Sequence, residues 1–217
     1  MAKKLNQEVI IKGLEWAYDK ALSGGVLDTA YDLAHDYLQK SKNKEEAISS
    51  LINWQTAKCA TSGFIAGCGG LITLPVTVPA NLVSVLFMQL RMIVAIAIIS
   101  GYDPKSDPVR SLAYVCLTGN AASNVLKGVG IKMGEKITEK AIEEISGRLM
   151  AKINQIVGAR LLTRFGKTGV VNLGKAIPIA GGIISGTFDA AATKIIGTIA
   201  TRVFYPGDVS SRYEPVL

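Results

Sequence analysis

One stretch of the sequence constrains the fold more than any motif. Between Lys58 and Asp103 the chain runs 44 residues with a single formal charge, that of Arg91. Residues 80–99 would form a helix about 30 Å long, which is the thickness of the hydrocarbon core of a bilayer. A charge near the middle of such a helix is rare in lipid and rare in a soluble core. Arg91 therefore needs a partner in either environment, and the candidates are Asp103, Asp189 or a backbone carbonyl at a glycine break.

Composition and periodicity both favour a helical chain. Only 19% of the 217 residues are charged and 49% are hydrophobic, whereas soluble domains carry about 25% charged residues. Helical periodicity is nearly continuous and strand patterns are almost missing, which predicts an all-α fold. We expect a single compact helical bundle over residues 1–205, with a proline-bounded apolar helical hairpin and glycine-rich C-terminal helices. A polar tail over 206–217 should follow.

Prolines divide the uncharged stretch into two apolar arms. Pro75 and Pro79 lack a backbone donor and disfavour helix before them, so a tight turn is expected between the arms. Leu86 and Phe87 lie in the second arm, and this hairpin is a candidate for insertion into a membrane. As a lone span the second arm is marginal, because Arg91 offsets much of its apolar character. The alternative is that both arms are buried in a water-soluble core.

Small residues recur at four-residue spacing in two regions. Gly63 and Gly67 form one pair, and Gly182, Gly186 and Ala190 form a second row. This spacing lets helix backbones approach closely, so both rows are expected to pack against other helices. For the first pair, a flexible loop is the alternative.

A long basic helix is expected over residues 131–162. One side carries an apolar stripe, and the other side carries the candidates for contact with anionic lipid, namely Lys132, Lys136, Lys140, Arg148 and Lys152. An ordinary helix with a solvated basic side is the alternative. At the N-terminal side of the chain, Asp28 and Asn43 are expected to cap two further helices.

Reactive constellations are missing from the sequence. Cys59, Cys68 and Cys116 lack C-x-x-C spacing and His35 is the single histidine, so neither a disulfide framework nor a zinc site is predicted. We expect no enzymatic activity, no cofactor and no metal. No nucleic-acid-binding signature accompanies the net charge of +7, so nucleic acid is not expected as a partner. No apolar segment follows the first residues, so the cytoplasm or the inner face of its membrane is expected.

Two blocks of the sequence resemble the EcsC family of bacterial proteins. The first consists of Leu74-Pro75 to Pro79, the apolar helix with Arg91, and Gly101-Tyr102-Asp103. The second runs from Ile177-Pro178 through Gly181-Gly182 and continues with Asp189, Thr193, Gly197, Ala200 and Phe204. The resemblance covers roughly residues 45–205. It implies an all-helical, membrane-associated cytoplasmic protein with no established reaction, linked by its family name to a transporter operon. It carries over no catalytic residue, and its matched polar positions suggest a polar cluster of Arg91, Asp103, Asp189 and Thr193.

Three functions remain open at this point. The first is a non-enzymatic protein of the cytoplasmic membrane face that binds anionic lipid and modulates a membrane partner such as a transporter or protease. The second is a soluble helical protein-binding module of the inhibitor or immunity type. The third is a pore former that inserts its hairpin.

Overall fold

The structure is a computed structural model that describes residues 5–25, 27–60, 80–134, 142, 144–171 and 180–206. Within these ranges the regular elements are all helical, and no described residue lies in a strand. The elements are α1 (Gln7–Ser23), α2 (Ala30–Lys40), α3 (Lys44–Ala60), α5 (Ala80–Ser100), α6 (Asp107–Cys116), the 3-10 helix η1 (Gly119–Ala121), α7 (Ala122–Lys127), α9 (Gly147–Val171) and α10 (Ala180–Phe204). The all-α class is therefore confirmed.

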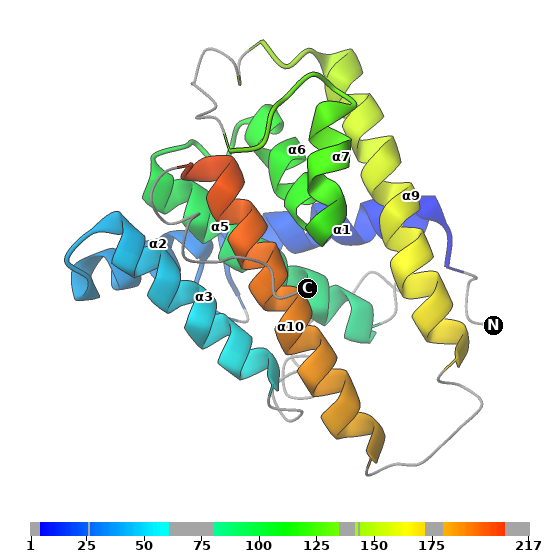
Figure 1. Ribbon diagram of the computed structural model, residues 1–217, viewed down its shortest axis with the longest axis horizontal. Helices are drawn as coiled ribbons and strands as arrows, with labels where there is room; N and C mark the ends of the chain where they lie inside the picture. Colours follow the sequence, from blue (N-terminus) through cyan, green and yellow to red (C-terminus); the bar gives the residue numbers. More distant parts are fainter. Residues whose placement is uncertain are drawn as a thin grey trace.

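α5 is the central helix of the bundle (Figure 1). It contacts α1, α2, α3, α6 and α10. Its side chains are buried on all sides, and Leu86, Leu90, Ile93 and Ile96 are fully enclosed. A helix that is apolar all round is stable in water only when other helices surround it, and here they do.

Within the described ranges, α5 is the one helix that is long and apolar enough to cross a membrane. The window Val83–Ser100 has a mean hydropathy of 2.2, and 83% of it is buried inside the bundle. The core helix of a soluble protein meets the same criterion, so this window by itself does not place α5 in lipid.

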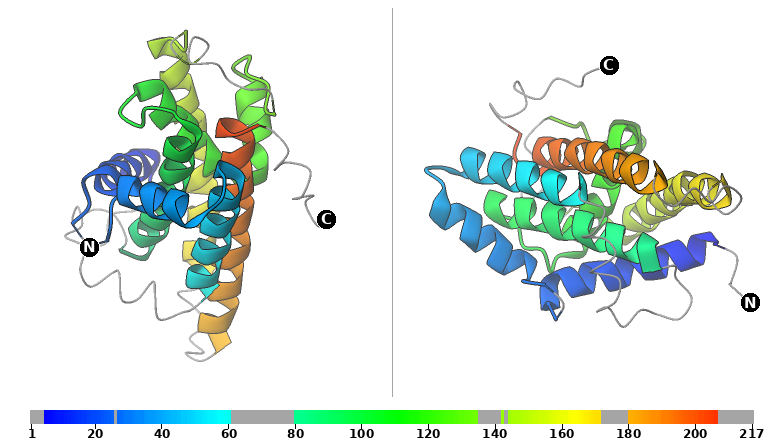
Figure 2. Two further views of the ribbon diagram at one scale, coloured as in Figure 1. Left: turned by 90° about the vertical axis from the view of Figure 1, so that its left-hand side faces the viewer. Right: turned by 90° about the horizontal axis from the view of Figure 1, so that it is seen from below.

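α3 and α10 lie side by side although they are far apart in the chain (Figures 1 and 2). They approach closely at Gly197, where an added Cβ would lie only 2.8 Å from the Cγ1 atom of Ile52. On the other side of the bundle α9 packs on α1 and α6. There an added Cβ at Gly158 would lie 2.9 Å from the Cγ atom of Gln7. Glycine thus sets the spacing of two helix pairs.

The start of α2 differs from the expected one. Thr29 is the N-cap, and a reciprocal capping box joins it to Asp32: the Asp32 N–H donates to Thr29 Oγ1 at 3.0 Å, and the Thr29 N–H donates to Asp32 Oδ2 at 3.0 Å. The expectation of Asp28 as the cap was wrong by one residue, because only Thr29 has a carboxylate three positions later. Asn43 does accept from the Glu46 N–H at 2.8 Å, so that cap is confirmed.

The long helix expected over 131–162 was wrong at its start. Of the described residues before Gly147, 131–134 and 144–146 are not helical. Gly134 has a φ of 92°, a left-handed conformation that a helix cannot continue. α9 begins at Gly147, after Ser146 Oγ accepts the Leu149 N–H at 3.3 Å. The apolar periodicity of the sequence continues across these breaks, so it predicted a helix start that is too early.

Four helix ends lie together at one end of the molecule (Figures 1 and 2). They are the C-terminal ends of α3 and α9 and the N-terminal ends of α5 and α10. The sequence that joins these ends is poor in charge: residues 61–79 contain no charged side chain, and residues 172–179 contain one, Lys175. We call this part of the bundle the charge-poor end.

Candidate functional site

Arg91 is the one charged side chain buried in α5, at 2% exposure. Its Nη1 donates to the backbone carbonyl oxygen of Asp28 at 2.9 Å, and its guanidinium lies 5.9 Å from the centre of the Phe87 ring. Asp28 lies in the linker between α1 and α2, just after Gly24 and Gly25, whose φ values of 73° and 112° turn the chain. A backbone carbonyl just before the N-cap of α2 therefore binds Arg91, and this bond ties the linker to the core helix.

Thr193 contacts the opposite side of α5 from Arg91. Its hydroxyl accepts from Gln89 Nε2 at 3.3 Å and donates to Cys59 Sγ at 3.5 Å. Gln89 and Arg91 are two positions apart on α5, so their side chains leave the helix on nearly opposite sides. The described contacts of Arg91 and Thr193 are thus separate.

The two carboxylates of the suggested cluster are not joined to Arg91 by a described bond. Asp103 follows α5 as an exposed residue, and its Oδ1 accepts from the Lys105 N–H at 2.9 Å. Asp189 lies in α10, and its side chain is outside the described part of the structure. The backbone places Arg91 and Asp103 on and just beyond the same helix, about three turns apart.

A neutral polar seam between α3, α5 and α10 was missed by the sequence reasoning. Its members are Gln55, Cys59, Gln89 and Thr193, all buried. Gln55 lies one turn before Cys59 on the same side of α3, and neither its Nε2 nor its Oε1 has a hydrogen-bond partner among the described residues. The available signal was Gln55 itself, a polar residue within the apolar stripe of α3. The seam offers amide, hydroxyl and thiol groups and no acid or base.

The titratable groups of the core are poor candidates for catalysis. Burial raises the pKa of the Cys116 thiol and of the Tyr18 and Tyr114 phenols well above their usual values. A thiol with a raised pKa is a poor nucleophile at neutral pH. The Tyr18 hydroxyl donates to the Pro104 carbonyl at 2.8 Å. The rings of Tyr18 and Tyr114 pack edge to face, with their centres 5.7 Å apart. These groups hold α1 to α6 and its preceding loop.

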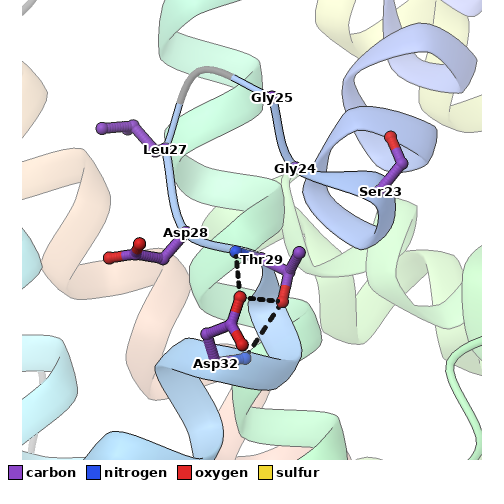
Figure 3. Close-up of a pocket in the computed structure, with 7 residues that line it drawn as sticks. All are labelled: Ser23, Gly24, Gly25, Leu27, Asp28, Thr29 and Asp32. Carbon is purple, nitrogen blue, oxygen red and sulfur yellow. Dashed lines mark hydrogen bonds between the residues drawn. The ribbon is translucent and has the colours of Figure 1, made fainter.

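A shallow hollow lies where α1 gives way to α2 (Figure 3). It is lined by Ser23, Gly24, Gly25, Leu27, Asp28, Thr29 and Asp32. The Asp32 carboxylate is engaged in the capping box, and the Thr29 hydroxyl and N–H lower its pKa. The Asp28 side chain points away from that pair in Figure 3. No group of three or more His, Cys, Asp or Glu side chains that could hold a metal occurs among the described residues. The hollow is best explained as the start of a helix.

The hairpin candidates divide between described and undescribed residues. Leu86 is fully buried and Phe87 is 2% exposed, both inside the bundle. Pro75 and Pro79 lie outside the described residues, as do the first arm and its pair Gly63 and Gly67.

The C-terminal row of small residues lies within one helix. Gly182, Gly186 and Ala190 all belong to α10, and Ala190 is half-buried. The surroundings of the two glycines are outside the description. The close approach that the structure does describe falls on Gly197, farther along the same helix.

The basic residues expected on one helix occupy different elements. Lys132 is exposed before α9, Arg148 and Lys152 are exposed on α9, and Lys136 and Lys140 lie outside the described residues. No acidic residue occurs anywhere in 147–171, although five basic residues do. Lysines of the N-terminal helices differ, because Lys12 and Lys40 each form a 2.6 Å ion pair with a carboxylate one turn away.

Taken together, the fold and these sites define an all-α protein with a bonded arginine in its core and no reactive constellation among its described residues. The chain belongs to the EcsC protein family, which matches residues 4–205. The match takes in α1 and α2, which precede the 45–205 region of the resemblance noted above. Comparisons with curated proteins and with solved structures returned no match.

Proposed function

We propose that this protein is a non-enzymatic helical protein that binds the anionic inner face of the cytoplasmic membrane and there modulates a membrane partner such as a transporter or protease. The observation that carries the proposal is the charge-poor end. Two connections with almost no charge in their sequence start and finish there, between four helix ends. Docking by this end would bring those sequences to the lipid while α5 keeps its helix neighbours.

Basic side chains on α9 supply the electrostatic part of the proposed interaction. Each Lys or Arg near an anionic leaflet contributes about 1 kcal/mol, and the effect fades within a Debye length of about 8 Å. By helical rise, Lys167 lies about 6 Å from the C-terminal end of α9 and Arg148 about 35 Å. Docking by the charge-poor end therefore makes Lys167, which lies within a Debye length of that end, matter more for lipid binding than Arg148.

A vesicle sedimentation assay tests this proposal. The protein should bind vesicles of phosphatidylglycerol, bind phosphatidylcholine much less, and lose affinity as salt is raised. Lys167→Gln should weaken binding by about fivefold, the change that about 1 kcal/mol produces, while Arg148→Gln should have less than about a twofold effect. The two variants remove the same charge from the same helix, so each controls for the other.

Three outcomes of this assay count against the proposal in different ways. Equal losses for the two variants would show docking along the side of α9 instead of by its end. Equal binding to phosphatidylglycerol and phosphatidylcholine would show that electrostatic attraction does not contribute to membrane binding. No binding of the unmodified protein to either lipid would overturn membrane association.

The second candidate is a soluble helical protein-binding module. The specific observation in its favour is that α5 is enclosed by five other helices, so the chain has a core without lipid. Fractionation of native cells separates the two functions. Recovery with the membranes at physiological salt, followed by release in a high-salt wash, favours the first, and full recovery in the soluble fraction before any wash favours the second.

A further inference from the structure

We infer that Trp54 anchors the charge-poor end in the interfacial layer of an anionic bilayer, with Lys58 beside it at the lipid headgroups. The inference rests on the proposed membrane association and specifies the side chain that enters the lipid interface.

Trp54 is the most exposed large hydrophobic side chain among the described residues, at 54%. The others, Tyr31, Leu38 and Ile195, are 37–38% exposed. Trp54 lies six residues before the end of α3, which places it about 9 Å from that end. The exposed part of the indole is apolar area that can still be buried, so contact with an interfacial layer at this position would be favourable.

Lys58 lies one turn nearer the charge-poor end, and its Nζ is 5.4 Å from the centre of the Trp54 ring. A matching pair occurs on α9, where the guanidinium of Arg164 is 5.2 Å from the centre of the Phe165 ring. Phe165 is likewise six residues before the end of its helix. Phe165 packs partly against the core, whereas Trp54 faces outward. Arg164 Nη1 also donates to the Leu117 carbonyl oxygen at 3.2 Å, so the Trp54–Lys58 pair is the outward-facing one of the two.

The chemistry of this pair favours the bilayer interface over other occupants. Tryptophan is enriched where membranes meet water, because its ring is apolar while its N–H needs a polar partner. A lysine beside it can cover the ring with its stem and direct its ammonium to phosphate. The sequence that continues from α3 has no charge until Arg91, so nothing in it opposes contact with lipid. An exposed tryptophan can also anchor a protein partner, which the test must distinguish.

Tryptophan fluorescence tests the inference directly, because the chain contains only two tryptophans. Trp16→Phe leaves Trp54 as the sole reporter, and Trp54→Phe leaves Trp16, which is half-buried on α1. Both variants are mixed with phosphatidylglycerol vesicles whose acyl chains carry bromine near the headgroups. Emission from Trp54 should shift to the blue and be quenched by bromine, and emission from Trp16 should change little.

A binding measurement complements the spectra. Trp54→Ala should weaken vesicle binding by about tenfold, while Leu38→Ala, at an exposed position on α2, should leave it unchanged. If the protein sediments with vesicles but Trp54 emission is unaffected, the anchor is elsewhere and the inference is overturned while membrane association stands. If Trp54 is shielded only when membrane proteins are present, a protein partner covers it and the inference is again overturned. If the protein never binds vesicles, the proposed function fails with it.

Discussion

Arg91 shows how a single buried charge is accommodated in an apolar helix. Removing an ion from water is costly, and the cost is tolerable only when the charge finds hydrogen-bonding partners. The described partner is the main-chain oxygen of Asp28, not its carboxylate, which is exposed. The arginine consequently holds a piece of backbone in place, and the identity of the side chain at position 28 matters little to the contact.

We expect Arg91→Ala to lower the free energy of unfolding by about 2–4 kcal/mol, since it leaves a cavity and an unpaired carbonyl. Arg91→Met should be tolerated much better, because it fills the same space without a charge to desolvate. Asp28→Ala is the control and should change stability by less than about 0.5 kcal/mol. Urea unfolding followed by circular dichroism measures all three. Equal effects of Ala and Met at position 91 would contradict this account.

At the scale of helices, the contact of α3 with α10 depends on the missing side chain of Gly197. A Cβ at this position would meet three atoms of Ile52 at 2.8–3.2 Å, which is closer than such contacts allow. Isoleucine is stiff at its first torsion, so it cannot move aside cheaply. Glycine here keeps α3 and α10 close enough to bury the seam of Gln55, Cys59 and Thr193 between them.

Gly197→Ala should therefore destabilise the protein by about 1–3 kcal/mol, even though alanine favours helix over glycine by about 1 kcal/mol. Combined with Ile52→Ala, the cost should be well below the sum of the two single changes, because the second change vacates the space that the first one needs. Thermal and urea unfolding of the four proteins give this coupling energy. Gly147→Ala is the matched control: its added Cβ would meet nothing within 4 Å, so stability should stay level or rise.

At the scale of the whole molecule, α5 is the element around which the others are arranged. A folded domain of this size is stable by only about 5–15 kcal/mol. One charged side chain forced into the centre of α5 is therefore enough to remove most of that stability.

Leu86→Lys should unfold the protein in detergent-free buffer, with a loss of more than about 4 kcal/mol, because Leu86 is fully buried in the bundle. Leu38→Lys, on the exposed side of α2, should have little effect. Circular dichroism and urea titration distinguish these variants. If the Leu86→Lys protein stays folded but no longer associates with membranes, this part of α5 inserts into lipid instead.

Sequence reasoning succeeded where the signals are local. The helix expected over 80–99 is α5, Ala80–Ser100, because the apolar run is long and ends at Gly101, which has a φ of 100°. It failed where one helix was drawn through Gly134, since periodicity outweighed a backbone break. It left several candidates open for the partner of Arg91, because a carbonyl 63 residues upstream has no signature in the sequence. The contact of Gly197 with Ile52 could not be predicted either, because one sequence alone does not indicate which helices pack against each other.

The placement of α10 has a consequence for biosynthesis. α10 leaves the ribosome after α3 and α5, and it covers both of them through contacts that span more than a hundred residues of chain. At about 5–20 residues per second, α5 emerges roughly 5–20 seconds before α10 is complete. During that interval a nascent chain presents an apolar helix with one side uncovered, much as a membrane-targeted chain does. Chaperones and targeting factors that bind this apolar helix would therefore compete with α10 for the same uncovered side.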